Sequence, residues 1–239
     1  MKFVVPRGTV LVADDNDQIR GVVRLALERA GYQVYEAADG AVADQLVTER
    51  LPHLVVLDMV MPYVAGLELL TRWRKRRLNM GVIVLTGFGD ANSVADALEA
   101  GADDYVTKPF HVRELVERVN AVLRRIQKLE PSGAEMVVGD VRLDLVGQRA
   151  VVGEQVVPLS KTEVALLREL MGSPGRVLAP DELLAKVWGP EYRGDAEILR
   201  TNIYRLRRKL KGGRFLQSRP GLGYFVASPT DPEPSAAQE

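Results

Sequence analysis

Short apolar runs alternate with amphipathic segments along the first half of the chain. Residues 9–13 (TVLVA) form such a run, and apolar residues then recur at helical spacing from Ile19 to Ala30, where Gly31 predicts a helix end. The cycle repeats four more times, with apolar runs at 34–37, 54–57, 82–85 and 104–106 and helical patterns near 40–50, 66–77, 91–100 and 112–127. Alternating strands and helices predict a doubly wound α/β domain with a five-stranded parallel sheet.

Polar side chains follow four of these five predicted strands. Asp14 and Asp15 follow the first strand, Asp58 the third, Thr86 the fourth and Lys108 the fifth. Because such sheets bind ligands at the carboxyl ends of their strands, we expect these side chains to share one crevice. Three converging carboxylates repel one another unless a cation lies among them, and oxygen ligands without histidine or cysteine suit Mg²⁺. A hydroxyl and an ammonium beside that ion form a cradle for a phosphoryl group.

The second half of the chain has a different pattern. Residues 137–159 alternate apolar and polar positions with glycine-containing turns, which predicts a small antiparallel sheet. Ser160 and Glu163 have the spacing of a capping box before a helix, and a second helix is predicted from Pro180 to about residue 187. A third helix covers about 196–211 and ends at the glycines 212 and 213, and residues 214–226 read as strand, tight turn and strand.

The third of these helices carries two kinds of side chain. Leucine and isoleucine at 199, 203, 206 and 210 are spaced as one buried stripe. Polar and basic residues are expected toward another face: Arg200, Thr201, Tyr204, Arg205 and Arg208, with Arg207, Lys209 and Lys211 nearby. Such a helix fits the major groove of DNA, where arginine reads guanine edges and other cations hold phosphates. Arg219, at the tip of the final hairpin, is placed to reach an adjacent minor groove.

Composition sharpens the division into two parts. We predict one domain over residues 1–128, a linker over 129–135, a second domain over 136–228 and a proline-rich, acidic, disordered tail over 229–239. Residues 1–135 carry a net charge of −2 and residues 136–228 of +5, within a chain whose total is zero. This asymmetry is typical of a protein of which only one half meets a polyanion.

Several kinds of site and location are excluded. The chain has no cysteine, so disulfides, zinc–thiolate sites and thiol nucleophiles are absent, and two histidines, His53 and His111, make a multi-histidine site improbable. No signal peptide and no 18-residue apolar stretch occurs. We therefore expect a cytoplasmic protein without a membrane partner.

The motifs VADD (12–15), LDMVMP (57–62), LTG (85–87) and ADDYVTKPF (102–110) together resemble the receiver domain of two-component response regulators. The resemblance covers residues 8–127 and implies that a sensor histidine kinase phosphorylates Asp58. It implies Mg²⁺ bound by Asp15, Asp58 and the backbone carbonyl of Val60, with Asp14 acting through water. Lys108 would pair with the phosphoryl oxygens, positioned by a cis bond to Pro109. Thr86 would move to bond the phosphoryl group, and Tyr105 would swing inward as a switch.

Three helices and a hairpin ending in PGLGYF resemble the winged-helix effector domain of the OmpR/PhoB family. The matching segments are LSKTEVALLREL, RVLAPDELLAKVWG and NIYRLRRKL, within residues 136–227. The resemblance implies binding to double-stranded DNA through Arg200, Thr201, Asn202, Tyr204, Arg205, Arg207, Arg208, Arg219 and Tyr224. It also makes the loop at 188–195 a candidate contact for RNA polymerase.

This sequence departs from the family pattern in places that bear on DNA recognition. Glu197 stands where a basic phosphate contact is usual, and Arg200 and Thr201 replace acidic and apolar residues. In the wing, Arg219 comes one position early and Pro220 takes the usual place of the arginine. The DNA sequence that is recognised therefore cannot be inferred by analogy.

Family members dimerise on activation, and this chain has residues that match the interface. Asp103, Asp104, Glu114 and Arg118 are predicted to form ion pairs between two receivers, while Val94 replaces the usual basic partner of the glutamate. Individual pairs of this kind contribute little. We expect phosphorylation to strengthen a homodimer.

Other interpretations remain open at this stage. A Mg²⁺-dependent phosphohydrolase also forms an aspartyl phosphate at the end of a parallel strand. An interaction protein would use the basic helix to dock on another protein. The basic run RWRKRR (72–77) is either a solvated helix end, favoured by the helix dipole, or a contact for the second domain, the kinase or DNA.

Overall fold

The chain forms two compact units, Met1–Gln127 and Lys128–Glu239. The computed structural model describes residues 7–78, 80–87, 91–128, 135–210 and 215–227. The predicted tail, residues 229–239, and residues 129–134 of the predicted linker lie outside the described residues. The sequence-based linker was one residue too long, because Glu135 begins a strand in which it pairs with Asp144. In the described parts no helix is long and apolar enough to span a membrane.

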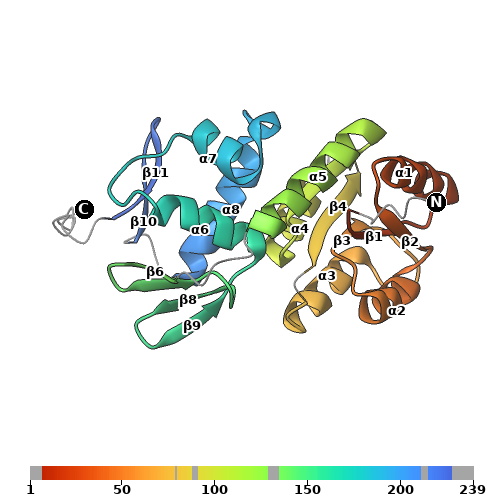
Figure 1. Cartoon of the computed structure of the whole chain (residues 1–239), viewed down its shortest axis with the longest axis horizontal. Helices are drawn as coiled ribbons and strands as arrows, with labels where there is room; N and C mark the ends of the chain where they lie inside the picture. The colour runs from red at the N-terminus through yellow and green to blue at the C-terminus, as the bar shows by residue number, and fades with distance from the viewer. Residues whose placement is uncertain (1–6, 79, 88–90, 129–134, 211–214, 228–239) are drawn as a thin grey trace, which may run out of the picture. The chain divides into compact units, whose positions relative to one another are not determined.

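The first unit is the predicted doubly wound domain (Figure 1). Its five strands are all parallel and lie in the order β2-β1-β3-β4-β5. The elements are β1 (Thr9–Ala13), α1 (Asp17–Arg29), β2 (Gln33–Ala37), α2 (Gly40–Arg50), β3 (Leu54–Asp58), α3 (Gly66–Lys75), β4 (Gly81–Gly87), α4 (Ala91–Ala100), β5 (Asp104–Lys108) and α5 (Val112–Lys128). Helix α3 ends two residues earlier than predicted, and Arg77 already has a left-handed backbone with a φ of 57°.

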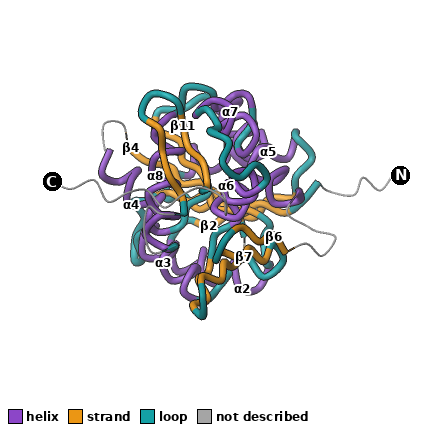
Figure 2. Tube along the Cα trace, turned by 90° about the vertical axis from the view of Figure 1, so that its left-hand side faces the viewer, coloured by secondary structure: helices purple, strands orange, loops and turns teal. Residues whose placement is uncertain are grey.

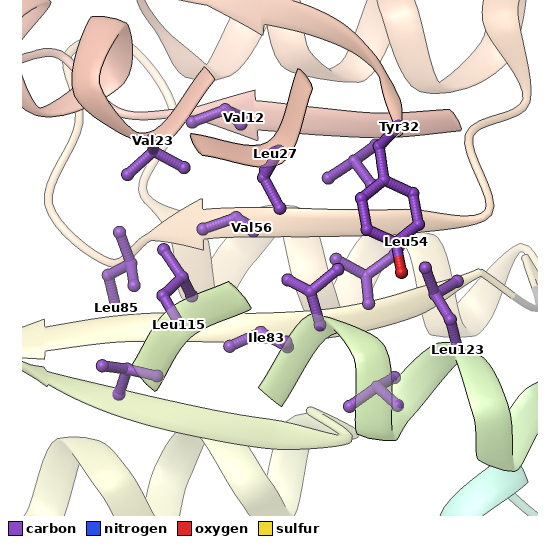
Figure 3. Packing of buried hydrophobic residues seen from close by; sticks show 14 residues of the cluster. Val12, Val23, Leu27, Tyr32, Leu54, Val56, Ile83, Leu85, Leu115 and Leu123 are labelled. Atoms are coloured by element: carbon purple, nitrogen blue, oxygen red, sulfur yellow. The ribbon is translucent and has the colours of Figure 1, made fainter. Parts of the chain in front are cut away.

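The core of this unit follows from strands that are apolar on both sides. Every residue of β3 is buried, as expected for a central parallel strand covered on both faces. Alternate residues of the strands, such as Val56 and Ile83, pack on one face against Val23 and Leu27 of α1 and Leu115 of α5 (Figure 3). Val22, which the spacing placed with the apolar positions of α1, is 51 % exposed and lies outside this stripe.

The second unit is an α+β domain with the predicted order of elements. Strands β6 (Glu135–Val138), β7 (Val141–Asp144), β8 (Arg149–Val152) and β9 (Gln155–Pro158) form an antiparallel sheet. Helices α6 (Lys161–Met171), α7 (Pro180–Val187) and α8 (Ala196–Lys209) follow, with the short 3₁₀ helix η1 (Pro190–Tyr192) before α8. The predicted capping box of Ser160 and Glu163 begins α6. The glycines expected to end α8 lie outside the described residues.

A two-stranded hairpin, β10 (Leu216–Arg219) and β11 (Gly223–Val226), completes this winged-helix domain. It is a strand group separate from β6–β9 (Figure 2). The hairpin attaches through Leu178 and Tyr224, whose backbone N–H groups each donate to the other's carbonyl, at 2.8 and 3.0 Å. A Cβ atom at Gly223 would lie 2.0 Å from the Leu178 carbonyl oxygen, so only glycine allows this approach.

Candidate functional site

Three carboxylates meet at the carboxyl ends of β1 and β3. One oxygen each from Asp14, Asp15 and Asp58 lies within 4.8 Å of the others. Asp14 and Asp58 are buried, whereas Asp15 is exposed. We call these three residues the acidic pocket. Their convergence was predicted, because parallel strands that neighbour one another bring their ends to one edge of the sheet.

Lys108, at the end of β5, supplies the positive charge of the acidic pocket. Its Nζ donates to Asp14 Oδ2 at 2.8 Å and to Asp58 Oδ2 at 2.7 Å. The peptide bond from Lys108 to Pro109 is cis, as predicted. One ammonium therefore serves two buried carboxylates.

The pKa values of Asp58 and Lys108 are both raised, and the causes show how charge is balanced in the pocket. Burial raises the pKa of the Asp58 carboxyl, the hydrogen bond from Lys108 opposes that rise, and the charge of Asp14 adds to it. Burial lowers the pKa of Lys108, but hydrogen bonds to the two carboxylates outweigh burial and the net shift is upward. Ionised Asp58 is thus incompletely compensated in the folded protein. Oxygen-only donors with an excess of negative charge are the donor set that a hard divalent cation takes.

Two local features of the loops hold the pocket in shape. Asn16 caps α1, its side chain accepting hydrogen bonds from the N–H groups of Gln18 and Ile19, and its own N–H donates to Asp14 Oδ1 at 2.9 Å. Gly66 begins α3 directly against the end of β3, where an added Cβ would lie 2.2 Å from the Asp58 carbonyl oxygen. Neither residue was singled out from the sequence, although asparagine before a helical pattern is an N-cap signal.

The remaining predicted residues of this site lie on or beside the same strands. Thr86 in β4 is buried, and its Oγ1 has no hydrogen-bond partner among the described residues. Tyr105 in β5 is half-buried. The Val60 side chain is exposed, and its N–H donates to Asp58 Oδ1 at 3.4 Å.

The acidic residues expected at a dimer surface are held inside the receiver. Asp103 is 2 % exposed and accepts hydrogen bonds from Arg74 and from the Val82 N–H, both at 2.9 Å. Asp104 is completely buried and pairs at 3.1 Å with Arg118. Each carboxylate thus has an arginine partner in its own domain, and the part of these residues in a dimer interface stays a prediction.

Arg118 also pairs with Glu114 at 3.1 Å, and the two side chains extend one network toward solvent. Val94, where a basic partner is usual, is 5 % exposed and part of the core. The basic run at 72–77 likewise has partners in the domain: Arg72 and Arg76 pair with Asp44, which also accepts from the Trp73 indole N–H at 2.7 Å.

Helix α8 buries the predicted apolar stripe and presents part of the predicted polar set. Leu199, Ile203, Leu206 and Leu210 are all buried. Arg200, Tyr204 and Arg208 are exposed, and Thr201 and Arg207 are half-buried. The Arg208 guanidinium lies over the Tyr204 ring, 5.8 Å from its centroid.

Two residues expected to contact DNA face the interior. Asn202 is completely buried, and its side chain donates to the Ile198 carbonyl at 2.8 Å. Arg205 is 6 % exposed and pairs with Glu163 at 3.5 Å. The expected contacts with DNA were wrong for both. Arg205 turns inward because α6 supplies the buried Glu163 carboxylate, and Asn202 turns inward to bond its own helix.

Glu163, Arg205 and Lys209 form what we call the buried glutamate cluster. Glu163 is completely buried, and its Oε2 accepts from Lys209 Nζ at 2.6 Å and from the Ser160 N–H at 2.7 Å. Burial alone would raise the pKa of Glu163, but the charges of Arg205 and Lys209 outweigh burial and lower it. The capping box was read as a helix start, and its second role as the bond between α6 and α8 was missed.

The wing places its two predicted residues at and beside its tip. Arg219 is exposed, with its guanidinium 5.5 Å from the centroid of the Phe225 ring. Tyr224 is half-buried and belongs to the strand that attaches the hairpin to the domain.

Comparison with known proteins gives matches over both units. Residues 10–120 match the response regulator receiver domain, and residues 153–226 match the C-terminal domain of transcriptional regulatory proteins. The chain is 36 % identical to the probable transcriptional regulatory protein TcrX of Mycobacterium tuberculosis, with 91 % of this chain and 94 % of TcrX covered. It is 32 % identical to the transcriptional regulatory protein SrrA of Staphylococcus aureus, with 95 % and 98 % covered. A solved structure of a RitR mutant has the same fold, with a TM-score of 0.77 at 23 % identity, over 92 % of this chain and 99 % of that one.

Proposed function

The chain belongs to the OmpR/PhoB family of two-component response regulators, and from that membership we propose that Asp58 accepts a phosphoryl group from a histidine of a sensor kinase. Phosphorylation then promotes receiver dimerisation and sequence-specific binding to promoter DNA. The observation that carries the proposal is the acidic pocket with Lys108 bonded to both of its buried members. A nucleophilic carboxylate and a cation that stabilises developing negative charge are the two requirements of phosphoryl transfer.

The transfer follows from the positions of these groups. A carboxylate oxygen of Asp58 forms a bond to phosphorus as the P–N bond to the kinase histidine breaks. The ring nitrogen takes the bonding pair, and the imidazole, which carries a proton on its other nitrogen, leaves as the neutral base. Lys108, now shared between Asp14 and Asp58, is placed to bond a phosphoryl oxygen, and the Thr86 hydroxyl, buried on the neighbouring strand, is available as a donor. Asp15, Asp58 and the Val60 carbonyl would hold Mg²⁺, with Asp14 acting through water, and the ion would neutralise charge on the transferred group when bound.

The only chemistry we assign to the chain is this transfer and the hydrolysis of its own acyl phosphate. A phosphohydrolase would instead turn over an external ester, and a generic phosphate ester offered with Mg²⁺ separates the two functions. Release of no more than one equivalent of phosphate supports the response regulator, and continued turnover would support the phosphohydrolase instead.

DNA binding is assigned to the exposed part of α8 and to the wing. Of the predicted DNA contacts, those with an exposed or half-buried side chain are Arg200, Thr201, Tyr204, Arg207, Arg208, Arg219 and Tyr224. Arg205 and Asn202 stabilise α8 through contacts on its buried side. The loop at 188–195, which contains η1, is proposed as the contact for RNA polymerase.

The experiment compares wild type with Asp58→Asn, each treated with a small-molecule phosphodonor and Mg²⁺. We expect wild type to sediment as a dimer and to bind promoter DNA more tightly, and Asp58→Asn to remain unchanged by the treatment. Binding must weaken steeply with salt, because phosphate contacts release counterions. Equal, monomeric behaviour of both proteins would contradict the dimerisation, and salt-insensitive binding would point to the interaction protein instead.

A further inference from the structure

We propose that Arg20 is a positioning residue of the acidic pocket: its guanidinium fixes the peptide group that joins Asp14 to Asp15, and with it the place of Asp15. The inference rests on the proposed function, in which Asp15 gives an oxygen to a divalent cation. It concerns a residue of α1 that lies outside the three carboxylates and outside Lys108.

The three members of the acidic pocket are held in different ways. Asp14 is fixed by Lys108 and by the Asn16 N–H, and Asp58 by Lys108 and by the Val60 N–H. The Asp15 carboxylate is exposed and takes part in no hydrogen bond or ion pair with another described residue. Its position in the pocket therefore depends on the backbone that carries it.

That backbone is held by Arg20. The Arg20 Nη1 donates to the Asp14 carbonyl oxygen at 2.8 Å, while the Asp14 N–H donates to the Ala37 carbonyl at 3.2 Å. A peptide group is planar, so the Asp14 carbonyl, the Asp15 N–H and the Asp15 Cα move together. A hydrogen bond to that carbonyl consequently sets the direction in which the Asp15 side chain leaves the main chain.

Arg20 can do this because its own side chain is fixed. It is only 14 % exposed, and its guanidinium also pairs with Asp17 in the first turn of α1 and, at 3.5 Å, with Glu36 at the end of β2. A planar guanidinium with five N–H donors can serve three acceptors on different elements at once, which a lysine ammonium on a flexible stem does less well. The loop between β1 and α1 is thus tied to both of its neighbours.

Charge and position predict opposite effects, which makes the proposal testable. A cation beside the acidic pocket repels a metal ion, so removal of Arg20 would strengthen Mg²⁺ binding if charge alone mattered. If Arg20 positions Asp15, its removal weakens Mg²⁺ binding instead. Arg24, one helical turn further along α1, is the matched control, since it pairs with the same Glu36 at 3.0 Å and contacts Glu28 rather than Asp14.

The experiment is calorimetric titration of the full chain with Mg²⁺ at fixed ionic strength, for wild type, Arg20→Ala, Arg20→Lys and Arg24→Ala. We expect Arg20→Ala to bind about tenfold more weakly, the size typical of lost support around a metal ligand, and Arg20→Lys to fall between it and wild type. Arg24→Ala should bind as wild type does, or slightly more tightly. The free energy of unfolding of the receiver, measured in urea, should fall by a similar amount in the two alanine variants. A difference in Mg²⁺ affinity between them then reports positioning and not a general loss of stability.

Equal or tighter Mg²⁺ binding by Arg20→Ala, with wild type and Arg24→Ala binding normally, overturns the role of Arg20 and leaves the proposed function intact. If Arg20→Ala does not fold, Arg20→Lys decides, because it keeps the charge and loses the forked geometry: wild-type affinity in that variant overturns the proposal. A wild-type chain that binds no Mg²⁺ would overturn the metal site of the proposed function, and this inference with it.

Discussion

The acidic pocket of the receiver and the buried glutamate cluster of the effector domain are built from the same kinds of side chain in opposite proportion. In the pocket one lysine serves two buried carboxylates, and burial raises the pKa of Asp58. In the cluster two cations serve one fully buried carboxylate, and their charges lower the pKa of Glu163. The first arrangement leaves negative charge to be neutralised by a ligand, and the second leaves none.

The difference matches the function that we propose for each region. A site that binds a cation and then a phosphoryl group must keep unmet charge near the surface, at the expense of stability. A helix that presents side chains to DNA needs a fixed base, and the glutamate cluster joins α8 to the capped end of α6. Three substitutions test this difference between the two regions, and they follow in order of decreasing effect.

Replacement of Glu163 by glutamine should cost the most. It keeps the volume and the capping geometry but leaves Arg205 and Lys209 without their countercharge, and breaking a buried ion pair in this way costs about 3–5 kcal/mol. Each domain has one buried tryptophan, Trp73 or Trp188, so urea unfolding of the effector domain is followed at Trp188 in a Trp73→Phe background.

The control for this change is Glu169→Gln on the same helix. Glu169 is half-buried rather than fully buried and pairs with its neighbour Arg168, and pairs that keep contact with solvent contribute about 0–1 kcal/mol. A Glu163→Gln variant as stable as Glu169→Gln would contradict the role of the cluster as the base of α8.

Removal of the shared lysine, Lys108→Ala, should have the second largest effect. Two charge-assisted hydrogen bonds are lost, but they share one partly exposed ammonium, so the receiver should lose about 2 kcal/mol, the size of one bond to a charged group. Mg²⁺ should restore more stability to this variant than it adds to wild type, because the ion replaces the missing charge. Urea unfolding followed at Trp73, with and without Mg²⁺, measures both effects.

Lys75→Ala is the matched control in the receiver. Lys75 is exposed at the end of α3, and surface substitutions of this kind usually stay within about 0.5 kcal/mol. If Mg²⁺ stabilises Lys108→Ala no more than Lys75→Ala, the acidic pocket is not short of positive charge.

The fold and the acidic pocket were predictable for one physical reason. Parallel strands covered on both faces are apolar throughout, as residues 54–57 are, so the strands are visible in the sequence. Once the strands are known, the chain topology alone brings Asp14, Asp58 and Lys108 to one edge of the sheet. Local patterns sufficed here because each of these residues lies at the end of a strand or directly after it.

The errors arose where a partner is distant in the sequence. Helical periodicity places Arg205 near the edge of the apolar stripe of α8 but does not reveal Glu163, 42 positions earlier, that draws it inward. Local patterns likewise do not reveal that Asp103 accepts from Arg74, which lies 29 positions earlier on α3. Arg20 was overlooked because its main acceptor is a backbone carbonyl, which no side-chain pattern reports.

The smallest effect, and the one of opposite sign, is expected from Asp58→Asn. Because burial raises the pKa of Asp58, the folded receiver binds a proton more readily than the unfolded chain between the ordinary value of 3.8 and the raised one. The ionised carboxylate therefore destabilises the fold. The stability that the protonated carboxyl contributes is complete below pH 3.8 and is lost as pH rises through the raised pKa.

An uncharged asparagine avoids this cost, so Asp58→Asn should raise the free energy of unfolding at neutral pH. The gain should shrink as pH falls through the raised pKa and vanish below 3.8, where the carboxyl is protonated in both states. The measurement is urea unfolding followed at Trp73 in a Trp188→Phe background, across a pH series without divalent cations. Added Mg²⁺ should reverse the order of stability at neutral pH, since it stabilises the complete pocket more than the one that lacks a carboxylate. Asp58→Asn that destabilises the receiver at every pH would mean that Lys108 compensates both carboxylates, and the contrast between the two regions would be lost.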